Sequence, residues 1–152
     1  MTSSIPNSIP TALLESPSFQ LERLRRRVRD AVEQALSTQN TTLREFWVLT
    51  CLIEESAASQ SHLSDTLAID ASDMVRLIDS LEERGWVKRE RDPRDRRRQI
   101  VASTKKGTKV HKDLASLVAT AEDEALDAST NKQLKHLRKL AQTIVLAGES
   151  EA

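Results

Sequence analysis

The sequence predicts a mainly α-helical protein that carries one short antiparallel β-hairpin. Three observations support this fold class. The 152 residues include only three glycines and four prolines, whereas the helix-favouring residues Ala, Leu, Glu, Lys and Arg are abundant. Apolar residues recur at steps of three and four along most of the chain, as they do in amphipathic helices. The exception is residues 87–101, where two strand-like segments flank a proline-containing turn.

Length and composition limit the class of protein further. A chain of this length is one domain with at most an added arm, and 38% hydrophobic residues are enough to build a core. Only 3% of residues are aromatic, which disfavours a stacking surface for single-stranded nucleic acid. The single cysteine, Cys51, rules out an internal disulfide. Without a long apolar run or an export signal, we expect a cytoplasmic protein that has no membrane partner.

The N-terminal part of the chain separates into an arm and a helix. Residues 1–12 hold two prolines and no charged residue, so we expect a flexible arm. Residues 13–37 predict a single helix, because their apolar residues form one stripe. The stripe consists of Leu21, Leu24, Val28, Val32, Ala35 and Leu36. The arginines at 25–27 and Arg29 lie on the side of the helix opposite to this apolar stripe, and such charged residues are typical of a face exposed to solvent.

A capping box marks the start of the second helix. Thr42 and Glu45 have the Thr-x-x-Glu spacing in which each side chain can bond the backbone of the other residue. The segment that follows, 46–53, is apolar nearly all round. We therefore expect this helix at the buried centre of the domain.

Two short helices follow in close succession. Ser59 is the expected N-cap of a helix at 60–67, and Asp70 is the expected N-cap of the next. Gly85 ends that next helix. About three residues separate the two helices, which is the length of the turn in a helix-turn-helix.

A basic hairpin lies between these helices and the C-terminal part of the chain. The segments WVKRE and RQIVAS have strand-like composition, and Pro93 with its neighbouring aspartates favours a turn between them. Residues 87–101 hold seven basic and three acidic side chains, a net charge of +4 in a chain whose formal charge is zero. We expect a wing with a positively charged tip, followed by C-terminal helices at 104–148 that begin with Thr104 as N-cap.

An arginine-bearing hairpin beside a helix-turn-helix indicates a protein that binds double-stranded DNA. The planar guanidinium suits phosphate oxygens, and a narrow protrusion can enter the minor groove. The helix after Asp70 would then lie in the major groove as the recognition helix. The alternative is a solvated ladder of salt bridges with little energetic effect. The helix-turn-helix directly upstream favours DNA binding, and residues 41–103 therefore predict a winged helix-turn-helix lobe.

Several segments resemble the MarR-type transcription regulators in order and spacing. They are TLREFWVLTCL, SQSHLSDTL and the long run from SDMVRLIDSLEERGW through DPRDRR to STKKG. The resemblance is close over residues 40–110 and loose in the flanking helices. It implies a homodimer held together by the helices at 13–37 and 104–148. It also implies binding to a pseudo-palindromic operator, usually with repression.

The wing supplies the first set of candidate DNA-binding residues. Arg94 and Arg96 lie at the expected tip, and we assign them to the minor groove. The resemblance implies that Asp95 orients Arg97. Arg97 and Arg98 are candidates for phosphate contacts.

The two short helices supply the second set. Ser72, Asp73 and Arg76 share a face of the recognition helix, and Arg76 is the best candidate for a guanine or phosphate contact. Asp73 is unlike the threonine or serine that similar proteins often carry there. It is suited either to a cytosine amino group or to the positive end of the helix dipole.

The start of the preceding helix adds three further candidates. Ser59, Gln60 and Ser61 begin it, and each hydroxyl suits either a phosphate or a plain capping role.

The resemblance also implies release from DNA by a small amphipathic or aromatic ligand. Candidate pocket residues are Trp47 and Cys51, one turn apart, with Val28 and Leu114 from neighbouring helices. Core packing is the alternative role for these apolar side chains. Cys51 is also a candidate for peroxide sensing, although its apolar surroundings and the lack of tyrosine disfavour a reactive thiolate.

Neither enzymatic activity nor a cofactor has support in the sequence. His62, His111 and His136 lie far apart without metal-ligand spacing, and no phosphate loop or nucleophile motif occurs. The remaining alternative to DNA binding is a winged-helix module that binds another protein. The basic wing beside a recognition helix favours DNA.

Overall fold

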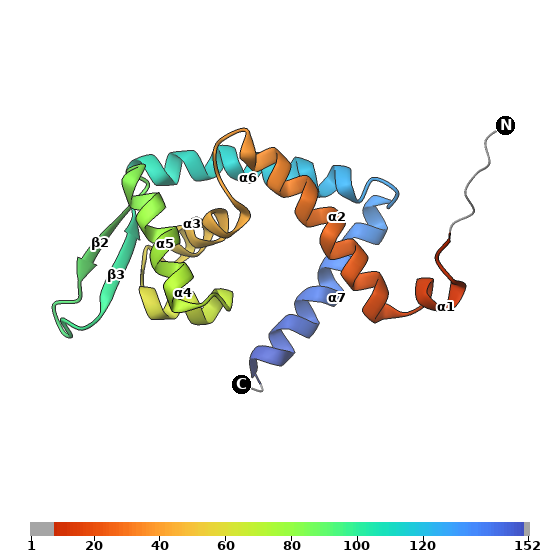
Figure 1. The fold of residues 1–152 in the computed structure, drawn as a ribbon, viewed down its shortest axis with the longest axis horizontal. Coiled ribbons are helices and arrows are strands. Elements are labelled where there is room, and N and C mark those ends of the chain that lie inside the picture. Colours follow the sequence, from red (N-terminus) through yellow and green to blue (C-terminus); the bar gives the residue numbers. More distant parts are fainter. Residues whose placement is uncertain (1–7, 151–152) are drawn as a thin grey trace.

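The computed structural model describes residues 8–150, and most of the expected N-terminal arm, residues 1–7, lies outside that range. The described chain is mainly helical with one small antiparallel sheet, as the sequence predicts (Figure 1). The helices are α1 (Thr11–Leu14), α2 (Pro17–Ser37), α3 (Leu43–Glu55), α4 (Gln60–Leu67), α5 (Ala71–Glu83), α6 (Lys105–Ala125) and α7 (Asn131–Ser150). The strands are β1 (Ala57–Ser59), β2 (Val87–Arg91) and β3 (Gln99–Ser103).

Two halves lie at opposite ends of α6, which is 21 residues long. At one end, α3, α4, α5 and the sheet form a lobe, and the β2–β3 hairpin projects away from it (Figure 1). At the other end lie α1, α2 and α7. No helix within the described range is long and apolar enough to cross a lipid bilayer.

The expectation of a single helix over 13–37 was wrong, because the chain breaks at residues 15–16 into α1 and α2. Pro17 explains the break, since it has no N–H to donate and is tolerated only in the first turn of a helix. It occupies that first turn of α2. The separate helix α1 also shows that the end of the expected arm, residues 11–12, is helical.

The third strand, β1, was not predicted. It pairs antiparallel with β3, so the sheet has the order β1-β3-β2. Three residues of sequence Ala-Ala-Ser are too short to show alternation and have little intrinsic strand preference. The strand forms because tertiary pairing with β3 satisfies its backbone groups.

The predicted helix caps are confirmed. Thr42 and Glu45 make both bonds of the capping box, while Ser59 accepts from the His62 N–H at 3.1 Å. Asp70 accepts from the Ser72 N–H at 2.8 Å and from the Ser72 hydroxyl at 3.0 Å, and these two hydrogen bonds lower the pKa of the Asp70 carboxyl. Gly85, which ends α5, has a φ of 76°, a conformation that favours glycine.

The Thr-x-x-Gly start of α6 locks that helix against the end of α5. The Thr104 hydroxyl accepts from the Gly107 N–H at 3.0 Å and donates to the Gly85 carbonyl at 2.6 Å. A Cβ at Gly107 would lie 2.0 Å from the Trp86 carbonyl oxygen, so no other residue fits there without a backbone shift. The motif therefore joins the base of the hairpin to the long helix.

The core of the lobe gathers around α3. Its buried side chains Val48, Leu49 and Leu52 pack with residues from every other part of the lobe and with α6. The partners include Leu36, Leu63, Met74, Ile78, Leu81, Val87, Val101 and Leu114. The prediction of α3 as the buried centre is confirmed for this face, although Trp47 is 38% exposed on the other.

Glu45 on α3 is the most buried carboxylate of the lobe, with a side chain only 6% exposed. One oxygen accepts from the Thr42 N–H at 2.9 Å, which completes the capping box. The other accepts from the Ser80 hydroxyl at 2.8 Å and from the Arg84 guanidinium. Arg84 also stacks 4.2 Å above the Trp86 ring. One acidic side chain thus joins the start of α3 to the end of α5.

Replacing Glu45 tests this network. We expect Glu45→Gln to lower the free energy of unfolding by about 1 to 3 kcal/mol, because the charge-assisted bonds with Arg84 are lost while the shape is kept. Glu54→Gln on the exposed side of the same helix should change it by no more than about 0.5 kcal/mol. Urea unfolding of both variants measures the difference, and equal values would contradict a structural role for the buried carboxylate.

Candidate nucleic-acid interface

Helices α4 and α5 have the arrangement of a helix-turn-helix. They are joined through residues 68–70, where Ala68 adopts a left-handed backbone with φ of 52°. The Ala68 N–H bonds the Asp65 carbonyl and the Ile69 N–H bonds the Ser64 carbonyl, so the turn is tight. Met74, Ile78 and Leu81 of α5 are fully buried. One face of α5 is thereby fixed to the lobe, and the other is left on the surface.

The outer face of α5 carries the three residues that the sequence singled out for the recognition helix. Ser72 and Arg76 are exposed and Asp73 is half-buried, so they share one accessible face. The Arg76 guanidinium donates to Asp73 Oδ1 at 2.5 Å. Arg44, from the first turn of α3, lies 3.7 Å from Asp73 Oδ2. Sequence reasoning missed Arg44 because its proximity to α5 depends on tertiary packing.

The hairpin is fastened to the same helix by Arg89. This β2 side chain is only 18% exposed and bonds the carboxylates of Asp79 and Glu82 on α5. Its backbone N–H also donates to Glu82 at 3.1 Å. Partial burial acts to lower the pKa of Arg89, but the two carboxylates outweigh it and raise the pKa. The direction in which the wing projects is therefore set relative to α5.

Two aspartates shape the tip of the wing. Asp92 accepts from the Arg94 N–H at 2.9 Å, and Asp95 accepts from the Arg97 N–H at 3.1 Å. Asp95 also accepts from the Arg97 side chain at 3.2 Å, which is the contact that the sequence implied. Both carboxylates thus fold the turn, and the guanidinium groups around them face solvent. The exposed arginines are Arg91, Arg94, Arg96, Arg97 and Arg98.

The three candidates at the start of α4 differ in accessibility. Ser59 is only 6% exposed, and its hydroxyl caps α4. Gln60 is half-buried, and its Oε1 has no hydrogen-bond partner within the described residues. Ser61 is exposed. Of the two roles expected for these residues, Ser59 has the helix-capping role. The Ser61 side chain is accessible to solvent and remains a candidate for phosphate binding.

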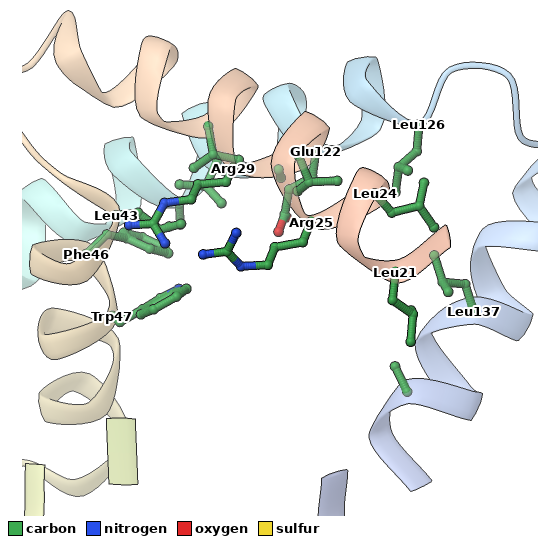
Figure 2. Close-up of a pocket in the computed structure, with 16 residues that line it drawn as sticks. Leu21, Leu24, Arg25, Arg29, Leu43, Phe46, Trp47, Glu122, Leu126 and Leu137 are labelled. Carbon is green, nitrogen blue, oxygen red and sulfur yellow. The ribbon is translucent and has the colours of Figure 1, made fainter. Parts of the chain in front are cut away.

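A pocket of about 610 Å³ lies where the two halves of the molecule meet (Figure 2). It is lined by α2, α3, α6 and α7, and it includes Val28 and Trp47 as expected. The expectation was wrong for Cys51 and Leu114, which do not line it. Leu114 is 1% exposed in the core, and Cys51 is half-buried on α3, one turn beyond Trp47.

The pocket has an apolar floor and charged groups at its edge. Phe46 and Trp47 of α3 lie on one side, and Leu21 and Leu137 lie on the other (Figure 2). Arg25 and Arg29 extend from α2 toward the space between them. The sequence analysis placed both arginines on a solvated face. Their spacing around Val28, within one turn of it, was the signal that could have assigned them to the pocket.

Burial shifts the pKa of both Glu122 and Cys51. Burial raises the pKa of Glu122, which also lines the pocket, although Arg138 acts in the opposite direction. Burial and the nearby Glu55 raise the pKa of the Cys51 thiol, which disfavours the reactive thiolate. Among the described residues, no group of three or more His, Cys, Asp or Glu side chains is placed to hold a metal ion.

A tight lobe with an exposed recognition helix and a projecting basic hairpin defines a winged helix-turn-helix protein. Residues 41–98 match the model of the MarR family. A MarR-family transcriptional regulator from Rhodococcus sp. RHA1 has 30% sequence identity and a TM-score of 0.78, with 86% of this chain and 95% of that chain covered. This chain belongs to the MarR family, a family of DNA-binding transcription regulators.

Two further relatives cover nearly the whole chain. CouR from Rhodococcus jostii RHA1, solved with p-coumaroyl-CoA bound, is 31% identical with a TM-score of 0.75 and covers 89% of this chain and 95% of its own. The HTH-type transcriptional regulator MgrA of Staphylococcus aureus is 28% identical over 138 residues, which are 89% of this chain and 91% of MgrA. The likeness therefore extends from the lobe into the flanking helices.

Proposed function

We propose that this transcription regulator binds a pseudo-palindromic operator as a homodimer and represses the genes beside it. The observation that carries the proposal is the fixed relation between α5 and the wing, which Arg89 ties together through Asp79 and Glu82. A helix such as α5 is about 10 to 12 Å across with its side chains, and this diameter fits the DNA major groove, which is about 12 Å wide. The wing then reaches the adjacent minor groove. Such a protein acts where the chromosome lies, in the cytoplasm.

Each group of exposed side chains has a separate role in this proposal. Arg94 and Arg96 at the tip enter the minor groove, where negative potential attracts guanidinium groups. Arg97 and Arg98 bind phosphates and fix the register of the protein on the duplex. Arg76 on α5 reads base edges, and the exposed hydroxyls of Ser61 and Ser72 bind phosphate.

The homodimer explains the apolar side chains that the single chain leaves exposed. Leu140 is 61% and Ile144 62% exposed on α7. The full set on α1, α2 and α7 is Leu13, Leu14, Leu21, Leu24, Leu137, Leu140, Ile144, Val145 and Leu146. Contiguous exposed apolar surface of this kind marks a protein–protein interface. A two-fold axis through this end places two recognition helices on two half-sites.

We further propose that the pocket takes an amphipathic anion with an aromatic or acyl part. Phe46 and Trp47 offer apolar faces, and Arg25 and Arg29 offer charge-assisted hydrogen bonds to an acidic group. CouR, which is 31% identical, binds such a molecule, p-coumaroyl-CoA. The pocket touches α2 and α3, so a ligand that favours one spacing of the two halves shifts the dimer toward or away from the DNA-binding state.

Two alternatives fit the structure less well. A redox sensor would need a reactive Cys51, whereas burial raises the pKa of that thiol. A module that binds only protein gives no role to five exposed arginines on a projecting hairpin. Catalytic function has no matching arrangement of side chains in the described residues, and the relatives are regulators.

Salt dependence and two arginine variants test the proposed DNA contacts. If each half-site neutralises about four phosphates, the logarithm of the association constant should fall with the logarithm of salt concentration with a slope of about −7. Arg94→Ala should weaken binding to all duplexes alike. Arg76→Ala should cost about 1 to 3 kcal/mol on the preferred sequence and relax the preference at that position.

Fluorescence anisotropy with a duplex selected from a random library, and with its scrambled version, measures these effects. Lys112→Ala on α6 is the matched control, because it removes one exposed cation that belongs neither to the wing nor to the apolar set assigned to the dimer interface. A slope near zero for the unmodified protein, or equal losses for Lys112→Ala and Arg94→Ala, would refute DNA binding through the wing.

Calorimetry with p-coumaroyl-CoA as the probe tests the pocket. We expect binding to the dimer that is weakened about tenfold or more in Arg25→Ala, because a charge-assisted hydrogen bond contributes about 1.5 to 3 kcal/mol. Arg26→Ala, the neighbouring residue that does not line the pocket, should bind like the unmodified protein. If the probe does not bind, or if both variants bind it equally well, this ligand class is wrong for the pocket.

A further inference from the structure

Asp73 places a negative charge on the surface of α5 that faces DNA. Its side chain is 41% exposed, and it lies in the first turn of the helix. A carboxylate there repels the phosphates of any duplex, so it opposes the general attraction that the wing supplies. The position of Asp73 therefore needs an explanation beyond support of the helix dipole.

Both oxygens of this carboxylate are already engaged by arginines. Arg76, one turn later on α5, donates to Oδ1 at 2.5 Å, and Arg44 from α3 lies 3.7 Å from Oδ2. A cytosine amino group would have to displace one of these partners. The contact to Arg76 instead holds a long, 73% exposed side chain in one direction. An arginine held in this way loses less side-chain entropy when its free N–H groups meet a guanine.

The same contact penalises wrong sequences. Where no guanine is in reach, Arg76 can gain only by swinging to a phosphate, and that motion leaves Asp73 Oδ1 without its partner beside the anionic backbone. On the preferred sequence, Arg76 can keep its bond to Asp73 through one nitrogen and donate to the base through the others, because a guanidinium carries five N–H groups. Both oxygens of the carboxylate therefore stay paired in the complex with the correct site.

We propose, on the basis of the DNA-binding function above, that Asp73 is a specificity-determining residue: its carboxylate, bridged between Arg44 and Arg76, orients Arg76 toward bases and opposes binding to other DNA. Asp73 is a positioning residue in this account and need not itself touch a base. Arg44 holds the second oxygen and keeps the carboxylate from turning toward the duplex.

The test compares Asp73→Asn with the unmodified protein on two duplexes. One is the sequence enriched from a random library by the unmodified protein, and the other is a scrambled duplex of the same composition. We expect Asp73→Asn to bind the scrambled duplex several-fold more tightly and the selected one no more tightly. The ratio of the two affinities should therefore fall at least several-fold. The slope against salt should also become steeper by up to about two, since each of the two chains in the dimer loses one repulsive charge.

The variant Arg76→Ala identifies the route of the effect. If Asp73 acts through Arg76, Asp73→Asn should change the affinity ratio little in a chain that already carries Arg76→Ala. Glu83→Gln is the charge-matched control, since it neutralises an exposed carboxylate at the far end of the same helix. It should leave the ratio unchanged.

Three results would overturn the inference. Equal tightening on both duplexes would make Asp73 a purely repulsive charge. If Asp73→Asn lowers the melting temperature of the protein but leaves the affinity ratio unchanged, Asp73 only stabilises the helix dipole. If Asp73→Asn lowers the affinity ratio just as much in a chain that already carries Arg76→Ala, Asp73 does not act through Arg76. Failure of the unmodified protein to bind any duplex is a different outcome, because it refutes the proposed function itself.

Discussion

Groups from the start of one helix and the end of another converge on the buried carboxylate of Glu45. It closes the capping box of α3 with one oxygen and accepts from Ser80 and Arg84 of the α5 region with the other. An unpaired carboxylate at this depth would be strongly unfavourable, so the two helices must keep their relative position. This contact helps to set the orientation of α5, and therefore of the side chains on its outer face that are proposed to read DNA.

Helix α3 connects that surface to the pocket. Its first turns point Phe46 and Trp47 into the pocket, whereas Arg44 and Glu45 contact α5. The wing joins the same unit through Arg89, so side-chain contacts link α3, α5 and the hairpin. In the proposed mechanism, a ligand moves this unit relative to the half that contains α7.

The sequence predicted the local features well, because caps, turns and periodicity are set by nearby residues. The capping box at Glu45 and the turn residues of the wing were assigned correctly for that reason. The strand β1, the break before Pro17 and the absence of Cys51 from the pocket were not foreseen. The pairing of β1 and the place of Cys51 depend on tertiary packing, which spacing along the chain does not reveal. The role of Asp73 was left between two alternatives because its partner Arg44 lies 29 residues away in sequence.

Two copies of this chain are proposed to bind one duplex, each through a recognition helix and a wing. Hydroxyl-radical footprinting of the selected duplex at a known protein stoichiometry tests this arrangement. We expect two protein chains per duplex and two symmetric protected regions whose centres lie one helical turn, about 10 base pairs, or a multiple of it apart. Protection of minor-groove positions flanking each region should come from the wings. A single protected region with one bound chain would show that the chain does not bind DNA as a two-fold dimer.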